Sequence, residues 1–184
     1  MIARALSDRQ QSKVSAIVLL ARETGMRLRE AILADLPRLQ CEIRRLGKIN
    51  IQDGTKGARS GASAPRWITV IDQVREALDR DSEVAPNGSR NLLAPDESYE
   101  DFMQAVVRPA RDILREYGLK GFHELRAAYA CDRYEQLVGF PAPVNGGRVH
   151  QEDRALDQRA RKQISHELGH NRIDVVSAYI GGRR

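Results

Sequence analysis

Two arginines, two histidines and one tyrosine stand at spacings that could serve phosphate chemistry. His123 and Arg126 are three residues apart, so on a helix they share a face and can meet one phosphate. His170 follows a Leu-Gly step, Tyr179 lies nine residues beyond it, and Arg27 follows a Thr-Gly-Met step near the start. Arginine forks hold phosphate oxygens, histidine transfers protons and a phenol can attack as a nucleophile. The set therefore suits cleavage of a phosphodiester by a tyrosine.

A zinc site competes for part of this set. Residues 166–170 read His-Glu-Leu-Gly-His, the pattern in which two histidines of one helix hold zinc in metalloproteases. A catalytic zinc needs a third protein ligand, and the 14 residues after His170 contain neither His nor Glu, with Asp174 the one candidate among them. Gly169 also indicates the end of a helix rather than its middle. We therefore reject a zinc hydrolase and expect no metal and no cofactor.

The composition fits one soluble domain that can bind nucleic acid. The 184 residues can build one substantial core, and no apolar run approaches the roughly 18 residues of a membrane span. Of the 30 basic residues 25 are Arg, and the net charge is +5, which permits a nucleic-acid partner without requiring one. Cys41 and Cys131 form no metal or disulfide pattern, so we expect reduced thiols and a cytoplasmic protein.

The first part of the chain has a helical pattern. Residues 7–10, Ser-Asp-Arg-Gln, fit a capping box, and apolar residues from Val14 to Ala21 recur at helical spacing. We expect a helix over residues 7–23 that stops at Gly25, followed by a short helix over residues 29–35.

In the next stretch, residues 39–51, apolar and polar residues alternate. Leu39, Cys41 and Ile43 alternate with polar residues, the segment 49–51 does the same, and the segment 67–71 is β-branched and aromatic. We therefore predict a small antiparallel sheet near the start of a mainly helical α+β domain.

A loop of small residues, 54–64, lies between the last two candidate strands and carries Lys56. Beyond the sheet the helical spacing returns and continues to the end of the chain. The helices expected there start at residue 72, run from about 102 to 118, over 123–138 and over about 152–166, and end with a segment that carries Ile173, Val176 and Tyr179.

The chain resembles the catalytic domain of the tyrosine recombinase, or phage-integrase, family over about residues 14–180. The motifs that carry the resemblance are Thr24-Gly25-Met26-Arg27, His123-Glu124-Leu125-Arg126, Leu168-Gly169-His170 and Tyr179, in that order. The resemblance implies a site-specific recombinase that breaks and rejoins DNA through a 3′-phosphotyrosyl bond, without metal or ATP. It further implies double-stranded DNA as partner, a homotetramer on DNA, accessory DNA-bending proteins, and a bacterial protein associated with the nucleoid.

The resemblance also implies roles for the residues of the set. Tyr179 matches the nucleophile of the family, while Arg27, Arg126 and His170 would hold the phosphate. Glu30 would support Arg27 rather than take part in the chemistry.

Two residues would manage protons. His123 would act as general acid and base or orient the phosphate, and Lys56 would protonate the departing 5′ oxygen, as a lysine between two strands does in this family. Two rivals share the fold: a type IB topoisomerase, which does not pair two DNA sites, and a DNA-binding regulator that has lost catalysis.

The sequence departs from the family pattern in three places. Ala127-Ala128 follow the second arginine where many members have His-Thr, and an insertion falls around residues 140–157. The N-terminal core-binding domain of relatives does not precede Met1. We therefore expect residues 1–184 to be a catalytic domain, in keeping with a fragment of a longer integrase from a mobile element.

Overall fold

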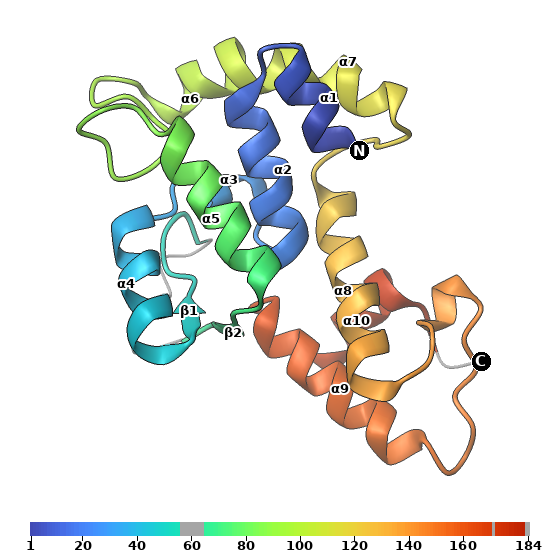
Figure 1. Ribbon diagram of the computed structural model, residues 1–184. Helices are drawn as coiled ribbons and strands as arrows, with labels where there is room; N and C mark the ends of the chain where they lie inside the picture. Colours follow the sequence, from blue (N-terminus) through green and yellow to red (C-terminus); the bar gives the residue numbers. More distant parts are fainter. Residues whose placement is uncertain (56–64, 171, 183–184) are drawn as a thin grey trace.

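The computed structural model describes residues 1–55, 65–170 and 172–182 (Figure 1). These residues form a mainly helical domain with a small antiparallel sheet, as the sequence predicts. Lys56 lies outside the described residues. None of the helices within these ranges combines the length and apolar character that crossing a bilayer requires.

Helix α2 (Ser12–Thr24) is the centre of the core. Its residues Val14, Ile17 and Leu20 have no exposed surface, and it contacts helices on several sides. Apolar residues around the whole circumference of a helix are typical of a buried helix. The neighbours of α2 include α1 (Ile2–Asp8), α5 (Asp72–Val84) and α8 (His123–Val138).

The single helix predicted over residues 7–23 is wrong at its start, because the chain forms α1 and α2 with a turn between them. Gln10 has a φ of 62°, which breaks the helix and folds α1 back onto α2. Ser7 lies inside α1 rather than at a cap, and its hydroxyl donates to Ser15 Oγ at 3.0 Å. The predicted end is confirmed, since Gly25 closes α2 in the left-handed conformation.

The strand predicted from Leu39, Cys41 and Ile43 is also wrong. These residues belong to helix α4 (Leu36–Leu46), which buries Leu36, Leu39 and Ile43, a spacing of three and four. Asp35, predicted as the end of the preceding helix, caps α4 instead by accepting a hydrogen bond from Arg38 N at 3.0 Å. The preceding helix, α3 (Leu28–Ile32), is correspondingly shorter than predicted.

The sheet has two strands, β1 (Lys48–Asn50) and β2 (Trp67–Thr69), paired antiparallel with Ile49 opposite Ile68. The alternation of the two strands buries Ile49 and Ile68 and leaves Trp67 41% exposed. The same alternation turns Arg66, just before β2, into the protein.

The long helix predicted from about residue 102 to 118 is continuous but changes its geometry. Helix α6 (Tyr99–Phe102) passes through a π-helical segment, η3 (Met103–Val107), into α7 (Arg108–Glu116). Pro109 cannot donate to the carbonyl of Ala105, and its ring would clash with that carbonyl in a regular α-helix. The wider π turn relieves this conflict.

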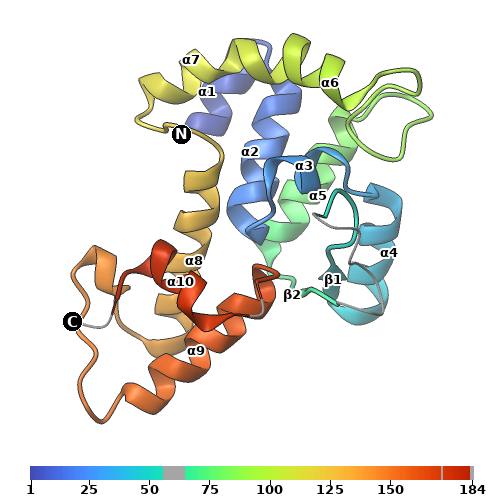
Figure 2. The ribbon, with the colours of Figure 1, turned by 180° about the vertical axis from the view of Figure 1, so that it is seen from behind.

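The C-terminal helices form a group around α8, which ends at Gly139 as predicted. Helix α9 (Arg154–Glu167) and helix α10 (Ile173–Ile180) both contact α8 and each other, and a 3-10 turn, η4 (Pro143–Asn145), lies in the loop before α9. Figure 2 shows α3 and α10 together on the face that is turned away in Figure 1. The turn between α9 and α10 thereby comes to lie near the end of α2.

A buried carboxyl on α5 gives the fold a pH dependence. Asp81 is fully buried, and neither of its carboxylate oxygens has a hydrogen-bond partner among the described residues. Burial raises the pKa of this carboxyl well above its ordinary value. Because the folded state holds the proton more tightly than the unfolded state, this group stabilises the fold at low pH. That stability is lost as the pH rises toward the raised pKa.

We expect Asp81→Asn to increase the free energy of unfolding at pH 7 by about 1 to 3 kcal/mol, because it removes a buried charge. Near pH 3 the carboxyl is protonated in both states, so the gain should disappear. Urea unfolding at both pH values measures this, with Asp79→Asn on the exposed face of the same helix as control. An equal gain at both pH values would contradict the role of the charge.

Candidate active site

The centre of the candidate site is the guanidinium of Arg126, which is 1% exposed. It donates hydrogen bonds to the backbone carbonyls of Gly25 and Leu168. Its Nη2 lies 3.1 Å from Nε2 of His170, and its Nε lies 3.4 Å from the hydroxyl of Tyr179. One side chain of α8 thus holds the end of α2, the turn after α9 and a residue of α10.

Tyr179 lies on α10 with its hydroxyl facing this cluster. The hydroxyl oxygen is 3.1 Å from Nε2 of His170, and the side chain is nearly buried at 8% exposure. The ring of His123, an exposed residue at the start of α8, has its centroid 5.3 Å from the ring of Tyr179. The structure therefore brings four of the predicted residues together: His123, Arg126, His170 and Tyr179.

Three nearby arginines, Arg27, Arg66 and Arg126, affect the pKa values of side chains at the site. Burial, followed by the charges of Arg66 and Arg27, lowers the pKa of Arg126 to about 10, so Arg126 remains charged at neutral pH. Burial and the charges of Arg126, Arg27 and Arg66 lower the pKa of His170 to about 4. His170 is consequently neutral at pH 7. With a guanidinium donor 3.1 Å from Nε2, we assign that nitrogen as an acceptor and Nδ1 as the protonated one.

Arg27 reaches the site from the turn between α2 and α3. Gly25 makes this turn with a φ of 65°, and a Cβ there would come within 2.6 Å of the Tyr129 ring, so both the conformation and the space require glycine. Glu30 then fixes Arg27 twice, by accepting from its backbone nitrogen and from its Nη1, each at 2.7 Å. The Arg27 side chain remains 37% exposed, the most accessible of the three arginines.

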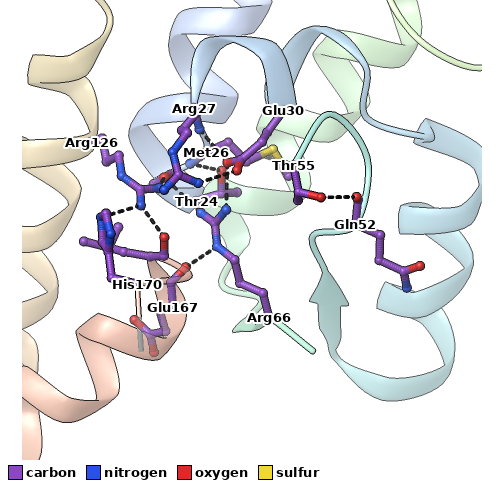
Figure 3. Close-up of polar contacts among 12 residues, drawn as sticks. Thr24, Met26, Arg27, Glu30, Gln52, Thr55, Arg66, Arg126, Glu167 and His170 are labelled. Atoms are coloured by element: carbon purple, nitrogen blue, oxygen red, sulfur yellow. Dashed lines mark hydrogen bonds and ion pairs between the residues drawn. The ribbon is translucent and has the colours of Figure 1, made fainter. Parts of the chain in front are cut away.

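Arg66 is a member of the site that the sequence did not reveal. Figure 3 shows the guanidinium groups of Arg27, Arg66 and Arg126 gathered between α3 and the turn that carries His170. Arg66 is 4% exposed and donates to Glu30 Oε2 at 2.7 Å, to the backbone oxygen of Glu167 at 2.6 Å and to that of Gly25 at 3.1 Å. The one available signal was its alternation with Ile68, which places Arg66 on the buried side of the strand.

Glu30 is the buried carboxylate that faces two of these arginines. Its side chain is fully covered, and it pairs with Arg27 and Arg66 at 2.7 Å each. Burial favours a raised pKa for Glu30, but the charge of Arg66 and the hydrogen bonds from Arg27 and Arg66 outweigh it and lower the pKa. Glu30 is thus ionised at neutral pH and neutralises only part of the local positive charge.

A sequence model described as Integrase matches residues 2–132, more than two thirds of the chain. The chain belongs to the phage-integrase, or tyrosine recombinase, family. Membership makes it a recombinase-type enzyme with DNA as its substrate. Searches of curated proteins and of solved structures give no match.

The matched segment contains Arg27, Lys56, His123 and Arg126, whereas His170 and Tyr179 lie beyond it. The structure joins the two groups, because Arg126 contacts both of the outlying residues.

Glu167, the glutamate of the His-Glu-x-x-His pattern, is hydrogen-bonded to other side chains of this integrase. Its carboxylate accepts a hydrogen bond from the Tyr129 hydroxyl at 2.9 Å and pairs with Arg133 at 3.0 Å, and both of these residues lie on α8. It also accepts a hydrogen bond from Gln163 on its own helix. Burial, with the charge of Glu167, raises the pKa of Tyr129. Glu167 therefore ties the end of α9 to α8, just before the turn that carries His170.

We expect Glu30→Gln to destabilise the integrase by about 3 kcal/mol, because it leaves the buried Arg66 without its counter-charge. Thermal unfolding at pH 7 measures the loss. The control is Asp112→Asn, which breaks an exposed ion pair with Arg115 and should leave Tm unchanged, because exposed pairs contribute little. Equal Tm values for Glu30→Gln and the unmodified protein would contradict the role assigned to Glu30.

Proposed function

We propose that residues 1–184 form the catalytic domain of a site-specific DNA recombinase that cleaves and rejoins DNA through Tyr179. The observation that supports this most directly is the position of the Tyr179 hydroxyl, 3.1 Å from His170 Nε2 and 3.4 Å from Arg126 Nε. A nucleophile beside a fixed cation and a neutral imidazole is the arrangement that attack on a phosphodiester needs.

The proposed reaction exchanges one phosphodiester for another. The phenolic oxygen of Tyr179 attacks phosphorus and loses its proton, the bond from phosphorus to the 5′ oxygen breaks, and that oxygen takes up a proton. The 3′-phosphotyrosyl bond that forms keeps the energy of the broken linkage, so a 5′ hydroxyl of another strand can reverse the step. The scheme requires no ATP, and we propose that it requires no metal.

The two family arginines divide the work of holding the phosphate in this proposal. Four of the five donor hydrogens of the Arg126 guanidinium are already directed at Gly25, Leu168, His170 and Tyr179. A phosphate would accept a hydrogen bond from the fifth donor hydrogen of Arg126. It would also compete with the side chains of His170 and Tyr179 for the hydrogens that are directed at them. Arg27 is more exposed and would meet the non-bridging oxygens more freely.

The two histidines have different environments and hence different proposed roles. Burial and three nearby guanidinium groups keep His170 neutral, with Nε2 accepting from Arg126, so this nitrogen would donate to the phosphate only after it gains a proton. A bound phosphate would offset that positive charge and make protonation of His170 easier. His123 is exposed beside the Tyr179 ring, where it would serve as general acid and base.

The assembly is proposed from family membership. Recombination joins two duplexes, which a homotetramer on DNA would hold together, with accessory DNA-bending proteins where the sites require it. Two alternatives share the fold. A regulator that binds DNA without cleaving it would form no covalent adduct, and a type IB topoisomerase would relax DNA without recombining paired sites.

We expect Tyr179→Phe to abolish covalent attachment to DNA and to leave DNA binding intact, because only the attacking oxygen is lost. The assay incubates protein in EDTA with nicked duplexes that carry candidate attachment sites from the native locus, followed by denaturing gels. Tyr117→Phe, at an exposed tyrosine after α7, is the matched control and should still form the adduct. An adduct with Tyr179→Phe would show that another residue attacks. Binding without adduct by the unmodified protein would favour the non-catalytic regulator.

The proposed role of Lys56 has a separate test. We expect Lys56→Ala to slow cleavage of ordinary DNA by about a hundredfold or more, because the 5′ oxygen leaves poorly without a proton. A substrate with sulfur at the bridging 5′ position should restore the rate, since a thiolate leaves without protonation. Arg27→Ala, which weakens phosphate binding instead, should not be rescued. Failure of the sulfur substrate to rescue Lys56→Ala would remove Lys56 from the proton pathway.

A further inference from the structure

A hollow of about 460 Å³ adjoins the site and is lined in part by Arg27, His123 and Arg126. Its lining also includes three basic residues that the proposed chemistry does not use. These are Arg111 and Arg115 of α7 and Lys120 of the loop before α8. We call this hollow the α7 groove.

The positive charge of the α7 groove is only partly balanced by neighbouring carboxylates. Over the described part of the chain its lining contains no Asp or Glu. The Arg111, Arg115 and Lys120 side chains are exposed, and Arg115 forms an ion pair with Asp112, which is 81% exposed. Exposed pairs of this kind exchange readily with a new partner. The lining of the groove therefore offers several exposed cations to an incoming anion.

The remaining lining of the α7 groove is apolar. Met26, Leu114 and Phe122 are buried, and Leu28 completes the set. A site for a free phosphate ion alone would have polar groups on all sides. An apolar lining with a basic rim suits a ligand in which anionic groups alternate with apolar ones. The backbone of DNA has this character, because it alternates phosphates with deoxyribose rings.

We infer that the α7 groove binds the backbone of the cleaved DNA strand next to the reacting phosphate, with Arg111 and Arg115 contacting neighbouring phosphates. The inference rests on the proposed function, because the groove is continuous with Arg27 and Arg126. Strand phosphates recur about every 3.4 Å along the duplex axis. A strand that places one phosphate at Arg126 must place others close by, and the groove supplies the cations on the α7 side. Arg111 and Arg115 are therefore positioning residues.

The experiment compares two matched double variants, both made in the Tyr179→Phe protein so that binding is measured without cleavage. One is Arg111→Gln with Arg115→Gln in the α7 groove. The other is Arg75→Gln with Arg80→Gln on α5, where both residues are exposed. Helix α5 crosses in front of α2 in Figure 1 and behind it in Figure 2, opposite to α3. Both pairs remove two positive charges, so a general effect of net charge is the same for each.

Affinity for a 30-base-pair duplex is measured between 50 and 200 mM salt. We expect the groove variant to bind about tenfold or more weakly near 100 mM salt. The slope of log affinity against log salt should fall in magnitude by about 1.8, two contacts at about 0.9 each. The α5 variant should keep the slope of its parent, and circular dichroism with Tm should show that both variants fold.

An unchanged slope for the groove variant, or the same change in both variants, would overturn the inference and leave the proposed chemistry standing. The adduct assay reports separately on that chemistry. DNA binding with the expected slope change but no adduct from the Tyr179 protein would support the groove and overturn the proposed cleavage. Absence of DNA binding by the parent protein would overturn both.

Discussion

The site depends on one buried cation. The Arg126 guanidinium is hydrogen-bonded to backbone oxygens from two turns that are far apart in sequence, at Gly25 and Leu168. Burying a charge is costly unless its donors are satisfied, and here backbone carbonyls supply that satisfaction. The same contacts decide where the turns lie, and through them the position of His170 and of α10. The positions of the two turns and of the site residues therefore depend together on Arg126, and Arg66 adds hydrogen bonds to Gly25 and to Glu167 at the end of α9.

The site as a whole carries more positive than negative charge. Arg27 and Arg66 pair with one buried carboxylate, Glu30, whereas Arg126 donates to backbone carbonyls. Burial, and after it the charges of neighbouring guanidinium groups, lower the pKa values of Arg126 and His170. In a low-dielectric setting such an excess raises the energy of the unbound protein. A bound phosphate anion would lower that energy, which favours binding of a phosphodiester at the proposed active site. In the proposed reaction the same arrangement would stabilise charge that develops on the phosphate oxygens.

The sequence predicted the helices that have long apolar patterns and clear glycine ends, such as α8 with Gly139 and α2 with Gly25. The sequence-based prediction failed where the same apolar residues fit both the spacing of a strand and the spacing of a helix. Leu39 and Ile43 fit a strand through Cys41, but they also fit a helix through Leu36, and the Asp35 cap decides for the helix. Local alternation over five residues could not distinguish the two.

The candidate residues were predictable where a motif surrounds them, and Arg66 was not, because its meaning depends on partners at Gly25, Glu30 and Glu167 that only the folded chain brings near. A lone arginine between Pro65 and Trp67 reads as a surface charge. Burial on the same side of the strand as Ile68 is what makes it part of the site.

The segment that matches the family ends at residue 132, in the middle of α8, yet the contacts of α8 carry the site past that point. Arg126, within the match, reaches Tyr179 and His170, and Tyr129 and Arg133 hold Glu167 at the end of α9. In this chain Arg126 and Tyr129, both within the matched segment, therefore depend on partners beyond residue 132, without which their buried donors would be unsatisfied. The position of Tyr179, the proposed nucleophile, is thus linked to the matched segment through polar contacts with Arg126 and His170.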